Sequence, residues 1–235
     1  MQKVGRTVQG VLQEAVCRII PDATEFRFSG RTDTGVHARE QCVSFLTSKS
    51  LECRRTLKSL NAIFPVDLWA NSLCSVDTGF DPRRFAVSRH YKYLFSNDSI
   101  PDYLKSHVVY VPFEPDMLLC EQVTKLFLGE KDFVNFRKTG SNEATTVRKI
   151  THFEIVKREI EDIYDKQRKI YYYEASIVSS SFLYRMVRNI MGAVFLVLRK
   201  KKTLEELKKL IRNEAVKFPS FAAPAKGLTL FKVEY

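Results

Sequence analysis

The 235-residue sequence has no run of apolar residues long enough to cross a membrane. The longest run, from Ile190 to Leu198, falls far short of the roughly 20 residues that a bilayer-spanning helix needs, and it predicts a buried helix instead. Disorder is not indicated either, because 45% of the residues are hydrophobic and 28% are charged. We therefore expect a globular protein with a sizeable core and no membrane partner.

Cysteine is sparse, and its pattern excludes a disulfide framework. The five cysteines are odd in number and include no Cys-x-x-Cys pair. We expect an intracellular, reducing compartment, and the cytoplasm, the nucleus and the mitochondrion remain open. The five are Cys17, Cys42, Cys53, Cys74 and Cys120.

Metal and nucleotide motifs are also lacking. Asp33 and His37 could be two metal ligands, but no further cluster of His, Cys and carboxylates has recognisable ligand spacing. Gly30 and Gly35 have the spacing of a phosphate-binding loop, yet Val36 and His37 stand where that motif needs Lys and Ser or Thr. The sequence thus predicts neither a metal nor a cofactor, and a metal-dependent nuclease ranks last among the functions considered.

Positive charge is in excess, with 38 Lys and Arg against 27 Asp and Glu, a net charge of +11. Such a balance favours a polyanionic partner, because cationic side chains release counterions from phosphates. Nucleic acid is the leading candidate, and an anionic membrane surface is second.

The segment Gly30-Arg-Thr-Asp-Thr-Gly-Val-His37 places one carboxylate, Asp33, on a short loop between two glycines. Glycine permits a positive φ, and Thr can hydrogen-bond the turn. Arg31, two residues away, can favour the ionised carboxylate. On local pattern alone, an ordinary turn capped by Asp and Thr is the preferred interpretation of the segment. The flanking segments alternate like strands, so we expect Asp33 on a loop between them.

Helical and alternating segments mix without strict β-α-β order, which predicts an α+β fold. We expect two similar halves, residues 1–96 and 97–235, each with a mostly antiparallel sheet flanked by helices. Thr7 is a candidate N-cap for the first helix, and Thr203-Leu-Glu-Glu206 is a capping box. The expected helices are 8–20, 54–64, 115–128, 182–198 and one after 203; the expected strands are 25–29, 41–45, 66–76, 87–96, 148–157, 170–178 and 228–235.

Aromatic and basic residues interleave along the strand expected at 87–96. Tyr91, Tyr93 and Phe95 share one face, and His90 and Lys92 share the other. An aromatic stripe is usually part of a core, but this mixture also suits a base-stacking platform beside a phosphate track. The two interpretations are equally weighted.

Four motifs, in this order and spacing, resemble the TruA family of tRNA pseudouridine synthases. The segments Thr7–Ala15 and Asp132–Arg137 look like further family segments, so the resemblance covers nearly the whole chain. The motifs are Gly30-Arg-Thr-Asp-Thr-Gly-Val-His37, Arg89-His-Tyr-Lys-Tyr93, Phe182-Leu-Tyr-Arg-Met-Val-Arg-Asn-Ile-Met-Gly192 and Ala223-Pro-Ala-Lys-Gly-Leu228.

The resemblance implies an enzyme that isomerises uridine to pseudouridine in tRNA, typically on the 3′ side of the anticodon stem-loop. Asp33 matches the catalytic aspartate, and Arg188 matches the arginine that pairs with it. Tyr91 matches the tyrosine that stacks on the target base and is a candidate for the final proton removal. Leu228 matches an apolar residue of the uracil pocket, and Arg31 matches a residue that would contact the flipped nucleotide or its backbone. The resemblance also implies a homodimer with a tRNA cleft spanning both subunits.

One departure from the family concerns the N-terminus. Members normally begin with a strand carrying Tyr-Asp-Gly and a Gly-Trp-Gln turn, whereas this sequence starts at Met1 almost directly in the Thr-Val-Gln helix. We expect either a truncated form or a sheet that tolerates the loss at some cost. A catalytically impaired RNA-binding or tRNA chaperone protein is therefore the alternative function. The charged segment 157–169 and the sequence Ser-Phe-Leu-Tyr-Arg resemble eukaryotic members of the family more than bacterial ones.

Overall fold

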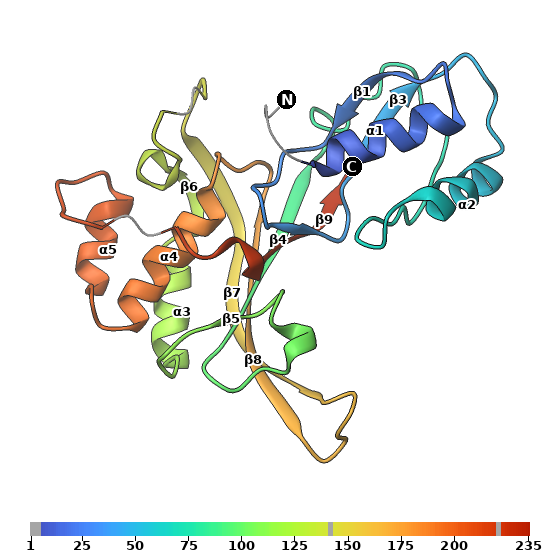
Figure 1. Ribbon diagram of the computed structural model, residues 1–235. Coiled ribbons are helices and arrows are strands. Elements are labelled where there is room, and N and C mark those ends of the chain that lie inside the picture. Colours follow the sequence, from blue (N-terminus) through green and yellow to red (C-terminus); the bar gives the residue numbers. More distant parts are fainter. Residues whose placement is uncertain (1–5, 141–142, 220–221) are drawn as a thin grey trace. The chain divides into compact units, whose positions relative to one another are not determined.

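The computed structural model describes residues 6–140, 143–219 and 222–235. It divides into two compact units, one made of the chain up to Gly30 with Cys42–Phe85, the other of Arg31–Gln41 with Ala86–Tyr235 (Figure 1). This division differs from the expected boundary after residue 96, because the strand expected to close the first half lies inside the sheet of the second unit. The loop with Asp33 belongs to that unit too, so all the candidate site residues lie in it.

The first unit packs helices against a two-stranded antiparallel sheet. The hydroxyl of Thr7 accepts a hydrogen bond from the backbone N–H of Gly10 at 3.1 Å, which confirms the predicted N-cap. The buried core of this unit includes Val16, Ile20 and Leu60. Its elements are α1 (Val8–Ile19), β1 (Thr24–Phe28), β3 (Val43–Leu46) and α2 (Cys53–Ile63).

The prediction of a strand at residues 66–76 is wrong, because this segment is irregular in the structure. Its apolar side chains Val66, Trp69 and Val76 are exposed. The segment is held instead by Asn61 of α2, whose amide exchanges two hydrogen bonds with the backbone of Ala70 at 2.8 and 2.9 Å. An alternating pattern becomes a strand only where another strand pairs with its backbone, and none does so here among the described residues.

The second unit is built on a seven-stranded, mostly antiparallel sheet, with the order β2-β9-β4-β8-β7-β6 and with β5 beside the end of β4. The pairs β2–β9 and β4–β5 are parallel, and the other pairs are antiparallel. The mixed composition confirms the expected α+β class. The strands are β2 (His37–Ala38), β4 (Ser88–Ser96), β5 (Val109–Tyr110), β6 (Gly129–Asp132), β7 (Val147–Glu161), β8 (Lys169–Ser179) and β9 (Leu228–Glu234).

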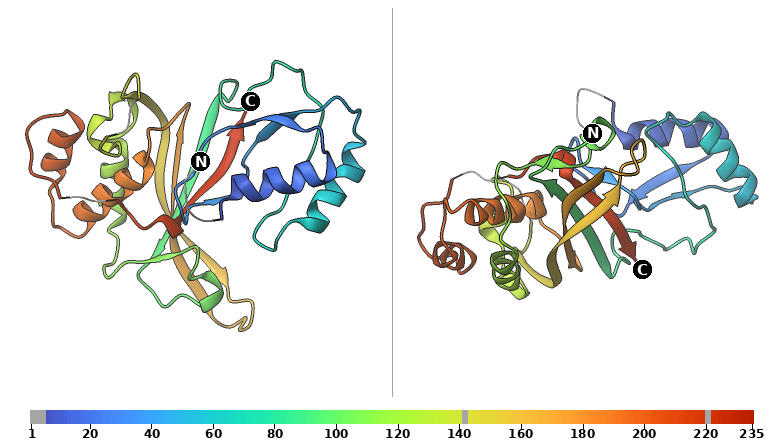
Figure 2. Two further views of the ribbon diagram at one scale, coloured as in Figure 1. Left: turned by 45° about the horizontal axis from the view of Figure 1, so that its top comes forward. Right: turned by 90° about the horizontal axis from the view of Figure 1, so that it is seen from below.

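Helices cover one face of this sheet (Figure 2). The capping box predicted at Thr203 is present, since Thr203 and Glu206 each accept a bond from the other's backbone N–H. The helix expected from residue 182 begins only at Met186, because Arg185 before it is left-handed, with φ 64°. The helices are α3 (Met117–Lys125), α4 (Met186–Leu198) and α5 (Leu204–Ile211), with short 3-10 turns η1 (Asp102–Leu104), η2 (Val134–Phe136) and η3 (Ala225–Gly227). No helix in the described part of the chain is long and apolar enough to span a membrane.

The two faces of β4 have different environments, as the alternation predicts. Tyr93 and Phe95 are buried in the main core, where the ring of Phe95 stacks on that of Tyr173 with centroids 5.3 Å apart. On the opposite face, the Nε2 atom of His90 lies 2.7 Å from the hydroxyl of Ser176, and Lys92 is paired to its neighbouring strand. The core interpretation therefore holds for Tyr93 and Phe95.

Alkaline pH should destabilise the second unit through its buried thiol and phenols. Burial, with a smaller contribution from Asp116, raises the pKa of Cys120 from 9.0 to about 12, and burial also raises the pKa of Tyr93. The unfolded chain loses these protons first, so their contribution is complete below pH 9 and is lost as the pH rises toward 12. Between the two pKa values of such a group, only the unfolded chain is ionised. Over that range each rise of one pH unit lowers the free energy of unfolding by about 1.4 kcal/mol per group.

Urea unfolding under reducing conditions at a series of alkaline pH values measures this slope. A Cys120→Ala protein loses the thiol contribution, so its stability should fall less steeply with pH than that of the original chain. Equal slopes for the two proteins would contradict the assignment to Cys120.

Candidate active site

The loop that carries Asp33 connects β1 to β2 and contains a tight turn. The backbone N–H of Val36 donates to the carbonyl of Asp33 at 3.0 Å, and Gly35 has a φ of 80°. A positive φ at the third residue of a four-residue turn requires glycine or a similarly tolerant residue. The expectation of Asp33 on a loop between strands is confirmed.

The far end of this loop is fixed to the sheet. His37 and Ala38 form β2, which pairs in parallel with Thr229 and Leu230 of β9. Immediately afterwards, the backbone N–H of Arg39 donates to the carbonyl of Leu230 at 2.8 Å. The carboxylate therefore lies a few residues from rigid backbone, which limits its movement.

Arg188 of α4 forms an ion pair with Asp33. The distance between Nη1 of Arg188 and Oδ2 of Asp33 is 2.5 Å, and the two side chains are only 14% and 10% exposed. Arg188 is itself held, because its Nε donates to the carbonyl of Ala223 at 2.8 Å and its own carbonyl accepts from the N–H of Ala223 at 2.9 Å. An arginine stays charged when buried, so it can hold a carboxylate in place through a charge-assisted hydrogen bond.

A second arginine, Arg185, also approaches the carboxylate, with its Nε 3.6 Å from Oδ2 of Asp33. Sequence reasoning did not assign it a site role, although its spacing of three residues from Arg188 would put both on one helical face. Arg31 was expected to stabilise the charge of Asp33, but it is exposed, and the ion pairs of Asp33 in the described structure come from Arg185 and Arg188, at and just after the N-cap of α4. Residues two apart on a loop need not face one another.

Tyr91 lies on the same face of β4 as Tyr93 and packs against the main core. Its ring packs edge-on against Phe182, with centroids 5.2 Å apart and planes at 90°. Burial raises the pKa of Tyr91 to about 12; Arg89 lowers it slightly, and the nearby negative charge of Asp33 adds to the rise. The register between β4 and β9 shifts at this point, between His90 and Tyr91. Such irregularities frequently re-aim a side chain next to an active site.

Leu228, the first residue of β9, is buried and pairs in register with Tyr93. The turn before it lies tightly against β4, because the hydroxyl of Tyr93 donates to the carbonyl of Pro224 at 2.9 Å. A Cβ atom on Gly227 would stand 2.8 Å from the Tyr93 ring and 2.8 Å from Cγ2 of Val109. The backbone can approach Tyr93 this closely only because residue 227 is glycine.

His37, the other member of the considered metal pair, makes structural contacts. Its Nε2 lies 2.9 Å from the carbonyl oxygen of Ser106, and its ring stacks on His107 with centroids 4.1 Å apart. The described residues contain no group of three or more His, Cys, Asp or Glu arranged to hold a metal ion. These contacts give His37 a structural role.

Replacing Gly227 with alanine should disturb the segment that positions Leu228. The added methyl must displace either the Tyr93 ring or β5, and overpacking of this kind costs about 1 to 3 kcal/mol of folding free energy. Thermal unfolding measures the effect. Gly79→Ala is the matched control, because no atom lies within 4 Å of a Cβ placed there. A Gly227→Ala protein as stable as the control would contradict the close approach.

Comparison with known proteins identifies the family. A family model described as tRNA pseudouridine synthase matches residues 123–235. The chain is 32% identical over its whole length to tRNA pseudouridine synthase A of Citrifermentans bemidjiense, covering 90% of that protein. It is also 32% identical over its whole length to the protein of the same name from Acetivibrio thermocellus, covering 92% of it, and 31% identical over 97% of its length to that of Thermotoga petrophila, covering 89% of it. The chain therefore belongs to the TruA family of tRNA pseudouridine synthases, which are isomerases.

Proposed function

We propose that this protein isomerises uridine to pseudouridine in tRNA, on the 3′ side of the anticodon stem-loop, with Asp33 as the nucleophile. The observation that carries the proposal is the nearly buried carboxylate of Asp33, held by Arg188 at 2.5 Å on a loop fixed to the sheet. A carboxylate nucleophile must be oriented and shielded from water, and the ion pair with Arg188 and the 10% exposure of Asp33 support both conditions.

The reaction requires no oxidant and no energy donor. Asp33 attacks the nucleotide at the sugar or the base, and the bond between N1 of uracil and C1′ of ribose breaks. The uracil then rotates and joins C1′ through C5, and the bond that Asp33 formed to the nucleotide breaks, which regenerates the carboxylate. The proton on C5 is released to solvent while N1 gains one, so the product has the same atoms as the substrate. Arg188 and Arg185 hold Asp33 in place before and after the attack.

Tyr91 suits a stacking role better than that of a general base. Because its pKa is raised to about 12, the phenol is neutral near pH 7, and a neutral phenol accepts a proton only if it passes its own proton on. Its ring can stack on the uracil, an interaction of about 1 to 3 kcal/mol per base. The buried side chain of Leu228 would line the uracil pocket.

The target base is inaccessible within a stem, so the nucleotide must be flipped out at a cost of a few kcal/mol. The net charge of +11 favours binding of the tRNA backbone, and the exposed side chain of Arg31 can contact the flipped nucleotide or its phosphate. We also propose a homodimer in a reducing compartment, for which sedimentation of the purified protein tests the subunit count.

Asp33→Asn should abolish catalysis while keeping the shape of the side chain. We expect pseudouridine formation to fall by about a thousandfold or more, because the amide is a poor nucleophile. Release of tritium from C5 of labelled uridine in tRNA measures the rate. Asp165→Asn, in the turn between β7 and β8, is the matched control. A fully active Asp33→Asn protein would refute the proposed nucleophile, whereas tRNA binding by the original chain without product would favour a chaperone.

Substitutions of Arg188 should separate its charge from its geometry. Arg188→Ala leaves a nearly buried carboxylate with a more distant partner, so we expect a loss of about 3 kcal/mol in stability together with a loss of activity. Arg188→Lys keeps a charge but cannot bond Asp33 and the carbonyl of Ala223 at once, so stability should largely return while kcat stays low. Arg199→Ala, exposed at the end of α4, is the control, and normal kcat in Arg188→Lys would contradict the orienting role.

A further inference from the structure

An exposed aromatic side chain, Tyr184, lies two residues before α4, and two cations lie over its ring. The Nζ atom of Lys138 lies 4.9 Å from the ring centroid, and Cζ of Arg185 lies 5.8 Å from it. The residue is 42% exposed, so solvent reaches the ring despite these contacts. An aromatic face flanked by cations is a common means of binding single-stranded nucleic acid, since bases stack on the ring while phosphates approach the charges.

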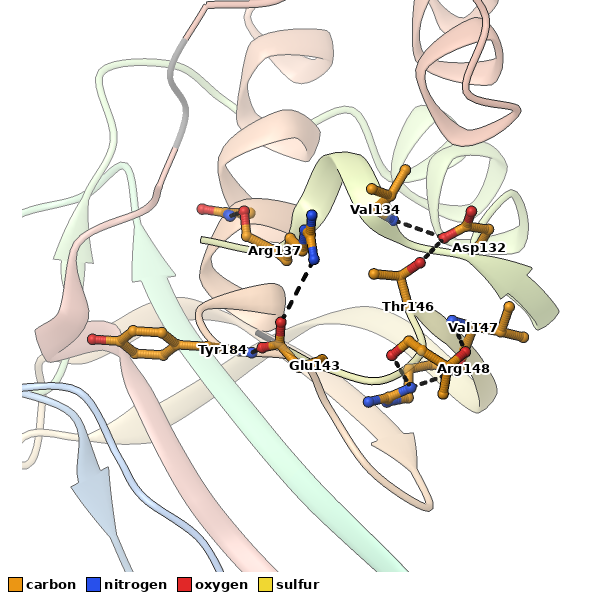
Figure 3. Close-up of polar contacts among 10 residues, drawn as sticks. Asp132, Val134, Arg137, Glu143, Thr146, Val147, Arg148 and Tyr184 are labelled. Atoms are coloured by element: carbon orange, nitrogen blue, oxygen red, sulfur yellow. Dashed lines mark hydrogen bonds and ion pairs between the residues drawn. The ribbon is translucent and has the colours of Figure 1, made fainter. Parts of the chain in front are cut away.

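The backbone of Tyr184 is fixed on both sides. Its N–H donates to Oε1 of Glu143 at 3.3 Å, and its carbonyl accepts from the N–H of Lys138 at 2.9 Å. Figure 3 shows Glu143 between Arg137 and Tyr184, with the tyrosine ring pointing away from the carboxylate. A ring on a fixed backbone loses little conformational freedom when a base stacks on it, which favours binding.

Arg185 connects this ring to the candidate nucleophile. The same guanidinium that lies over the Tyr184 ring has its Nε 3.6 Å from Oδ2 of Asp33, so one side chain links the ring to the carboxylate. Arg185 is also 39% exposed, whereas Arg188 is almost buried, so it can reach toward RNA as well as toward Asp33. A nucleotide next to a uridine held at Asp33 would pass close to Tyr184.

We propose that Tyr184 stacks on the base of a nucleotide flanking the target uridine, while Lys138 and Arg185 bind the phosphate beside it. This inference rests on the proposed function, because it requires an RNA strand at Asp33. The stacking partner replaces part of the base stacking that is lost when the uridine is extruded. This stacking should accept any of the four bases beside the uridine, because every base has an aromatic face.

Steady-state kinetics with tRNA, measured by tritium release, test the proposal first. Tyr184→Leu keeps an apolar side chain but loses the aromatic face, so KM should rise about tenfold, within the range that stacking energies predict. Tyr184→Phe keeps the face and should retain the original KM. Lys138→Met should raise KM and reduce the salt dependence of binding by about one phosphate contact. Tyr164→Leu, at an 84% exposed tyrosine in the β7–β8 turn, is the matched control and should change nothing.

Fluorescence gives a second measure that does not depend on catalysis. An anticodon stem-loop RNA with 2-aminopurine next to the uridine should be quenched by the original chain and by Tyr184→Phe, but much less by Tyr184→Leu at saturating protein. Equal melting temperatures show that the variants are folded. Unchanged KM and unchanged quenching in Tyr184→Leu would overturn the proposal. Absence of tritium release from the original chain would instead contradict the proposed function, and quenching would then decide the role of Tyr184.

Discussion

The ion pair between Asp33 and Arg188 is the interaction on which the candidate site depends. Its members are 155 residues apart in the chain, and both side chains are nearly buried. Removing two charges from water is costly, and the cost is recovered only with good geometry and with partners for the remaining polar atoms. Arg185 and the carbonyl of Ala223 provide those partners. The loop, α4 and the segment before β9 must therefore all be in place for the ion pair to form.

The sheet of the second unit provides the rigidity that this ion pair needs. β4 pairs with both β8 and β9, so its inward residues have fixed neighbours on each side. Tyr93 and Phe95 anchor the strand in the core, while Tyr91, two residues before Tyr93, reaches the site from the same face. Gly227 allows the chain before Leu228 to lie against Tyr93. The same packing that stabilises the core thus sets the distances around Asp33.

The start of α4 combines strain with chemistry. Arg185 takes a left-handed conformation that costs a non-glycine residue about 1 kcal/mol, and this backbone turn ends the extended segment and starts the helix. Hydrogen bonds from Lys138 and to Glu143 hold the residue before it. As a result, one short segment presents Tyr184 to solvent and Arg185 and Arg188 toward Asp33. Local backbone strain of this kind tends to collect at functional sites.

Sequence alone determined the features that depend on near neighbours. The Thr7 cap, the Thr203 capping box, the glycine turn after Asp33 and the buried character of α4 follow from short-range hydrogen bonding and hydrophobic periodicity. The motifs also sufficed to recognise the family. Only the tertiary structure decided which charges meet: it paired Asp33 with Arg185 and Arg188 and left Arg31 exposed. Among the described residues it pairs no strand with residues 66–76, and its two units do not divide the chain after residue 96. Pairing of strands and burial of charges depend on partners far away in the chain, and local sequence patterns do not specify those partners.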